Sequence, residues 1–193
     1  MGTKTSQLPD GFQERSASWH LDHIAEFTQF KGQIGEPSPH LAIVGYLSAD
    51  YPTKQRLWLL GCYAATYCLP TAQAIWALYP HGLVRENPPK LTEWLRKNWK
   101  GIVTRTERRC VRTPEKMSAC LTSYVKWMDT EYPKLTQLPR GEYTPENYDT
   151  VWESVSKIYY FGRYINIRLV EGLRRYFAIP ARLYDIRSIG GWS

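Results

Sequence analysis

Hydrophobic residues recur about once per helical turn through most of the chain, and this period predicts α-helices. The expected helices cover residues 16–32, 36–50, 51–68, 70–79, 88–99, 113–132 and 144–177, the last with a possible kink at Gly162. No segment alternates apolar and polar residues with the period of two that a half-buried strand shows. The pattern therefore predicts an all-α fold, a single helical domain of roughly eight or nine helices.

The most apolar stretch, LWLLGCYAATYCLPTAQAIW, contains a break at Pro70. Proline has no amide hydrogen, so one helix must end there and another must begin. Polar and aromatic side chains surround the break, namely Tyr67, Thr71, Gln73 and Trp76. Free amides at the new helix start suit an anion, the two aromatic rings suit stacking on a nucleobase, and Gln73 suits reading its edge. The alternative is a helix–helix corner whose polar groups are satisfied internally.

The ends of the predicted domain follow from composition. Residues 1–13 are polar and predict a flexible N-terminal segment, which leaves a helical domain over 14–193 to contain any catalytic site. The start of the chain lacks the apolar core of a signal peptide, and the longest apolar run is too short to span a bilayer. None of the 4 cysteines belongs to a C-x-x-C pair. These features predict a cytoplasmic protein with no membrane partner.

Standard catalytic and metal motifs are missing from the sequence. It has no phosphate-binding loop, no nucleophile elbow, no dinucleotide fingerprint and no zinc-deaminase signature. His20 and His23 lie one helical turn apart beside Asp22, but no third ligand is obvious, so we expect no metal site.

Basic residues exceed acidic ones and favour a polyanionic partner. The formal net charge is +7, which predicts attraction to nucleic acid without indicating a fold. The segment TRTERRCVR concentrates this charge in Arg105, Arg108 and Arg109. Guanidinium groups bind phosphate through parallel donors, so these residues are candidate phosphate ligands. A solvated basic face is the alternative.

Two further segments combine acids with arginines. In FGRYINIRLVEGLRR, Glu171 lies among arginines and tyrosines and is either a general base or a surface ion-pair partner, while Arg163 is a candidate anion ligand. In the tail RLYDIRSIGGW, Asp185 and Arg187 lie in irregular sequence, where functional groups often occur. Asp185 is a candidate proton acceptor, or alternatively the N-cap of a short last helix.

Three segments, RLWLLGCYAATYCLPTAQAIW, YYFGRYINIRLVEGL and LYDIRSIGGWS, together resemble the phage α-glutamyl/putrescinyl thymine pyrophosphorylase family, also called amino acid:DNA transferases. The resemblance covers patches between Leu57 and Ser193. It implies hypermodification of thymine in phage DNA, in which an amine from an amino acid or polyamine replaces the (pyro)phosphate on phosphorylated 5-hydroxymethyluracil. The family has been likened to helical DNA glycosylases, which act on an extruded base, although the sequence shows no clear helix-hairpin-helix glycine motif.

The resemblance implies roles for the candidate residues. The incoming amine must lose a proton, for which Asp185 is the first candidate and Glu171 the second. Arg187 suits the carboxylate of an amino acid, and Tyr67 and Trp76 suit stacking on the extruded base. The residues expected to bind the leaving group are Arg105, Arg108, Arg109 and Arg163.

The implied reaction involves no redox step, so no organic cofactor is expected. The implied partners are DNA carrying phosphorylated 5-hydroxymethyluracil and a free amino acid or polyamine, in the host cytoplasm for a phage-encoded protein. Three other functions stay open at this point: a glycosylase-like hydrolase, a non-catalytic nucleic-acid-binding protein, and a helical interaction module with a basic surface.

Overall fold

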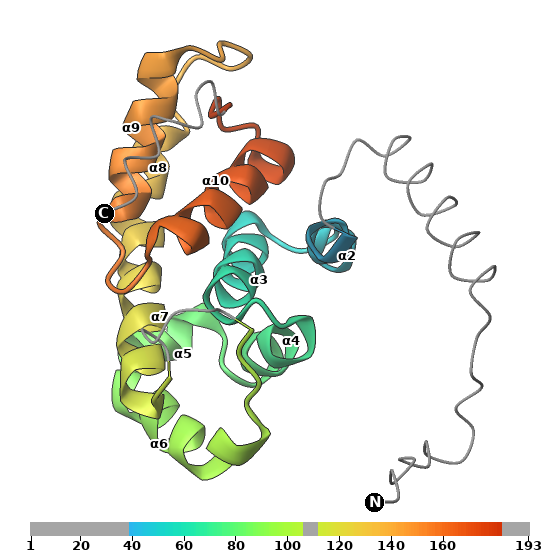
Figure 1. Cartoon of the computed structure of the whole chain (residues 1–193), viewed down its shortest axis with the longest axis vertical. Helices are drawn as coiled ribbons and strands as arrows, with labels where there is room; N and C mark the ends of the chain where they lie inside the picture. The colour runs from blue at the N-terminus through green and yellow to red at the C-terminus, as the bar shows by residue number, and fades with distance from the viewer. Residues whose placement is uncertain (1–38, 106–111, 183–193) are drawn as a thin grey trace, which may run out of the picture. The chain divides into compact units, whose positions relative to one another are not determined.

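The computed structural model describes residues 39–105 and 112–182, and these residues form helices joined by short connections (Figure 1). In chain order the elements are α2 (Pro39–Ser48), α3 (Thr53–Thr66), α4 (Leu69–Leu78), α5 (His81–Glu86), α6 (Pro88–Asn98), the short 3-10 helix η1 (Trp99–Gly101), α7 (Pro114–Thr130), α8 (Tyr132–Leu135), α9 (Pro145–Ser156) and α10 (Arg163–Phe177). The described residues contain no strand, and those from His40 onward belong to one compact unit. The predicted all-α class is confirmed. The predicted boundary near residue 13 lies outside the described residues.

The central element of the core is α3, whose residues 57–66 are all buried. It packs against α4, α7 and α10, as its nearly continuous apolar sequence predicts (Figure 1). Two of these helix crossings depend on glycine. A Cβ atom on Gly61 would overlap the ring of Tyr124 in α7, and one on Gly172 of α10 would overlap the side chain of Leu60. Because glycine has only a hydrogen atom as its side chain, these two positions let the helix backbones approach closely.

A stack of aromatic rings joins α3 to α7. The Tyr124 ring lies 6.4 Å from Trp58, 5.5 Å from Trp127 and 5.7 Å from Phe161, measured between ring centroids. The Tyr124 hydroxyl donates a 2.8 Å hydrogen bond to the carbonyl of Leu57. Burial raises the pKa of Tyr124 well above its ordinary value, so this phenol stays protonated and keeps donating.

Helix ends confirm some predictions and correct one. Thr113 caps α7 by accepting from the amide of Lys116 at 3.2 Å, and Thr144 caps α9 in the same way. The single helix predicted over 144–177 is wrong, because α9 ends at Ser156 and α10 begins at Arg163. Between them Tyr160 adopts a left-handed conformation with φ of 61°, which no α-helix can contain. This break redirects the chain so that α10 packs against both α3 and α9 (Figure 1).

The basic segment after α6 is not helical in its described part. The amide of Arg105 donates to the carbonyl of Thr66 at 2.9 Å, and Thr71 pairs with Val103. Residues 103–105 therefore lie along the corner between α3 and α4. The remaining residues of the segment up to 111 lie outside the described residues.

Candidate active site

The corner between α3 and α4 begins with Tyr67, which ends α3 in a left-handed conformation with φ of 49°. Its amide donates to the carbonyl of Tyr63 at 2.7 Å. Pro70 lies in the first turn of α4, as the sequence predicts. The buried Thr71 hydroxyl donates to the carbonyl of Val103 at 2.9 Å and accepts from its amide at 3.2 Å. Thr71 therefore satisfies backbone groups within the protein, as the alternative interpretation of this corner expects.

The exposed side of the Tyr67 ring meets two residues of α10. The ring of Tyr164 approaches it edge-on, with centroids 5.6 Å apart. The guanidinium carbon of Arg168 lies 5.3 Å from the centroid of Tyr67 and 5.4 Å from that of Tyr164. A hydrogen bond with Tyr164, followed by burial, raises the pKa of Tyr67. At neutral pH Tyr67 is therefore an uncharged phenol beside a cation.

Glu171 lies one helical turn beyond Arg168 and connects it to a second arginine. Arg168 Nη1 lies 3.4 Å from Glu171 Oε2, and Arg175 Nε lies 3.8 Å from Glu171 Oε1. All three side chains are largely shielded, with exposed fractions of 23%, 17% and 20% for Arg168, Glu171 and Arg175. The Nε atom of Arg168 is buried and has no hydrogen-bond partner in the described part of the chain. We call the following residues the α10 cluster: Tyr67, Tyr164, Arg168, Glu171 and Arg175.

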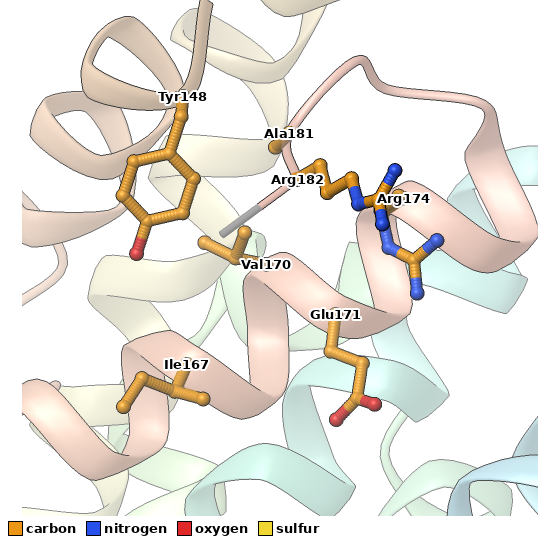
Figure 2. A pocket seen from close by; sticks show the side chains of 7 residues that line it. All are labelled: Tyr148, Ile167, Val170, Glu171, Arg174, Ala181 and Arg182. Atoms are coloured by element: carbon orange, nitrogen blue, oxygen red, sulfur yellow. The ribbon is translucent and has the colours of Figure 1, made fainter. Parts of the chain in front are cut away.

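A cavity of about 380 Å³ adjoins the α10 cluster and shares Glu171 with it (Figure 2). We call it the α10 cavity; it is lined by Tyr148, Ile167, Val170, Glu171, Arg174, Ala181 and Arg182. Its outer wall exists because the chain reverses after α10. Ala178 takes a left-handed conformation with φ of 54°, and the amide of Ile179 donates back to the carbonyl of Leu173 at 3.3 Å. This turn returns residues 181–182 to the side of α10.

The family model for amino acid:DNA transferases matches residues 39–187. The match covers most of the chain and includes both the α10 cluster and the α10 cavity. The chain belongs to the amino acid:DNA transferase family. No curated protein and no solved structure is significantly similar to it, so the expected likeness to DNA glycosylases stays a prediction. Membership confirms the family resemblance and indicates transferase chemistry with DNA and an amino acid as substrates.

The sequence-predicted residues of this transferase occupy several places. Tyr67 and Glu171 meet in the α10 cluster through Arg168. Arg105 is exposed beside the same corner, and Arg163 is exposed at the first position of α10. The predicted residues that lie outside the described residues are Arg108, Arg109, Asp185 and Arg187, together with the histidine pair His20 and His23.

Trp76 contacts residues at and before the start of α3, whereas Tyr67 lies at the other end of that helix. Its indole nitrogen donates to the carbonyl of Gln55 at 3.1 Å, and its ring meets that of Tyr51 edge-on at 4.9 Å. It lines a separate cavity of about 330 Å³ that also includes His81. Gln73 is half-buried on α4. Tyr67 and Trp76 therefore have different neighbours among the described residues, and their shared role in stacking on a base stays a prediction.

Sequence reasoning missed several residues of the site. Arg168 and Tyr164 are among the arginines and tyrosines around Glu171 in the sequence, but neither was predicted as a site residue. Their spacing at 164, 168, 171 and 175 follows one side of a helix, and this signal was available in the sequence. Arg182 has no such signal, because only the turn at Ala178 returns it to α10.

Two kinds of feature are absent from the described residues. None of the described helices is long and apolar enough to cross a membrane. No group of three or more His, Cys, Asp or Glu side chains in those residues is arranged to hold a metal ion.

Proposed function

We propose that this protein transfers the amine of a free amino acid or polyamine onto the 5-methylene carbon of phosphorylated 5-hydroxymethyluracil in DNA. A carbon–nitrogen bond forms, the bond from that carbon to the (pyro)phosphate oxygen breaks, and the oxygen keeps the electron pair. The amine loses one proton to a protein carboxylate. The observation that supports this function is the contact of Arg168 with both Tyr67 and Glu171, inside the region matched by the transferase family.

Arginines at the corner stabilise the departing (pyro)phosphate in this proposal. Negative charge on the leaving oxygen grows as its bond to carbon breaks, and fixed donors lower the energy of that state. Arg168 is suited to the role because its side chain is largely shielded from water and its buried Nε has no hydrogen-bond partner among the described residues. Arg105 and Arg163 supply further positive charge from the corner and the start of α10. Arg108 and Arg109 have the same role in the proposal, on sequence grounds.

Tyr67 provides a surface for the extruded base. A base in duplex DNA must leave the helical stack before its 5-substituent can be reached. An aromatic ring recovers part of the lost stacking energy, on the order of 1–3 kcal/mol per base. The raised pKa of Tyr67 keeps its ring uncharged, so the phenol does not repel phosphate. Trp76 is the second candidate for stacking on the base, and Gln73 is the candidate for reading its edge.

Proton removal is assigned to Asp185, with Glu171 as the alternative acceptor. Glu171 already contacts two guanidinium groups, which supports a role in holding Arg168 and Arg175 in position. Glu171→Gln keeps the shape of the side chain and removes its charge. If Glu171 is the general base, the variant loses the step of the reaction whose rate depends on ionisation of this carboxylate. If Glu171 only positions the arginines, the variant mainly changes how tightly the DNA substrate binds.

The proposal is tested with the full chain, duplex DNA that carries 5-phosphomethyl- or 5-pyrophosphomethyl-deoxyuridine, and a mixture of glycine, serine, glutamate and putrescine. We expect release of phosphate or pyrophosphate, and mass spectrometry of digested nucleosides should find the amine adduct. If no amine supports release, the proposal is wrong. If abasic sites form instead, the protein is a hydrolase.

Arg168→Gln identifies where the chemistry takes place. Removing one donor to a developing oxyanion typically lowers turnover about 100-fold or more. Arg96→Gln is the matched control, because Arg96 is an exposed arginine that pairs with Glu115 at 2.7 Å on another side of the protein. Equal activity of the two variants would exclude Arg168 from the reaction. Circular dichroism of both variants checks that each is folded.

A further inference from the structure

Two arginines line the α10 cavity, and neither has an acidic partner among the described residues. Arg174 comes from the last turn of α10, and Arg182 comes from the chain that returns after Ala178. Figure 2 shows both guanidinium groups reaching the same side of the cavity. Neither arginine forms an ion pair with any of the described residues, in contrast to Arg168 and Arg175.

Paired guanidinium groups at a cavity indicate an anionic ligand. Like charges held close together repel each other, and a bound anion removes that repulsion. The fork of donors on arginine matches the two oxygens of a carboxylate, which it binds through parallel hydrogen bonds. The anion expected here is therefore a carboxylate or a phosphate.

Glu171 adds an opposite charge to the same cavity. Its carboxylate lines the space shared with Arg174 and Arg182, and Figure 2 shows it set apart from their guanidinium groups. A phosphate would be repelled by this carboxylate. A molecule with an anionic end and a cationic end, in contrast, is attracted at both. This separation of charge is the property that distinguishes an α-amino acid from an inorganic anion.

The remaining lining suits the side chain of such a ligand. Ile167, Val170 and Ala181 are apolar, and Tyr148 contributes a largely buried ring. The volume of about 380 Å³ lies near the lower end of the range of small-molecule pockets, about 300–1,000 Å³. The cavity therefore suits a compact ligand better than a nucleotide.

From these observations we propose that the α10 cavity binds the donor substrate as an α-amino acid zwitterion. Arg174 and Arg182 hold the α-carboxylate, and Glu171 receives the ammonium group. Because Glu171 also contacts Arg168, the nitrogen end of the donor faces the α10 cluster, where the proposed function has the DNA base react. This inference depends on the proposed function and narrows its donor to compounds with a carboxylate, which excludes putrescine.

Kinetics with the two arginine variants test the assignment. Loss of a charge-assisted hydrogen bond should raise the KM for the amino acid by about 10-fold to 100-fold in Arg174→Gln and Arg182→Gln. The KM for DNA should change no more than it does in Arg96→Gln, which removes the same charge elsewhere. Arg182→Lys keeps the charge but loses the fork, so we expect an intermediate KM. An unchanged KM for the amino acid in both glutamine variants would overturn the assignment.

Binding without DNA separates this inference from the proposed transfer reaction. Saturation-transfer NMR of the full chain with glycine, serine and glutamate should show binding that Arg182→Gln weakens, whereas putrescine should not bind. Inorganic phosphate should not displace the amino acid; displacement would identify the cavity as a phosphate site and overturn the inference. Amino acid binding without any transfer to DNA would refute the proposed function alone. Transfer from putrescine as efficient as from an amino acid would refute this inference alone.

Discussion

Replacing Gly61 by alanine tests how tightly α3 and α7 pack. An added Cβ would overlap the ring of Tyr124. This ring cannot easily move, because it is fully buried, stacks on Trp58, Trp127 and Phe161, and donates a hydrogen bond to Leu57. Either the two helices must separate or the ring must leave its stack.

The expected loss of stability follows from these contacts. Overpacking a filled core costs about 1–3 kcal/mol. Displacing the Tyr124 hydroxyl leaves the buried carbonyl of Leu57 without its donor, which costs about 1–3 kcal/mol more. Alanine favours a helix interior over glycine by about 0.5–1 kcal/mol, which offsets part of the loss. We therefore expect Gly61→Ala to lower the free energy of unfolding by about 1–5 kcal/mol, a large part of the about 5–15 kcal/mol typical of a domain.

Urea unfolding followed by tryptophan fluorescence measures this change, and Trp58 and Trp127 lie beside the perturbed ring. Gly82→Ala is the matched control, because Gly82 lies in α5 and a Cβ there would meet no atom within 4 Å. It should be neutral or slightly stabilising. If Gly61→Ala is as stable as Gly82→Ala, the close crossing of α3 and α7 is wrong.

Three further predictions concern other parts of the fold. Burial, followed by the charges of Lys54 and Arg85, lowers the pKa of His81 in the folded protein. As pH falls, His81 therefore gains a proton in the unfolded chain before it does so in the folded protein, and the stability of the fold decreases below about pH 6.5. The melting temperature of His81→Gln should consequently fall less than that of the wild type between about pH 7.5 and pH 5.5. Thr71→Val leaves both backbone groups of Val103 without their partner and should lower the free energy of unfolding in urea by about 1–3 kcal/mol. If the variant instead keeps its stability but loses activity, Thr71 contacts the substrate. Thr113→Ala removes the cap of α7 and should cost about 1 kcal/mol in the same assay.

Much of the helical architecture was predictable, because its causes are local in sequence. Thr113 and Thr144 precede prolines at helix starts, and each caps its helix as this pattern predicts. The buried character of α3 follows from its apolar composition. The break between α9 and α10 was not predictable in the same way. Gly162 indicates a kink, but no residue type before it indicates that the chain turns at Tyr160, a residue that rarely adopts a left-handed conformation.

The same distinction between local causes and long-range packing applies to the candidate site. The sequence by itself determined the types of side chain available: an aromatic ring at a proline break, an acid among arginines on one helix, and an excess of positive charge. Only the tertiary structure decided which of them meet. Tyr67 contacts Arg168 across the crossing of α3 and α10, where Gly172 lets the two helices approach closely. Arg182 joins Arg174 because the chain reverses at Ala178. Helix formation depends on neighbours within one turn, whereas these contacts join residues far apart in the chain, and their geometry depends on packing that no local pattern records.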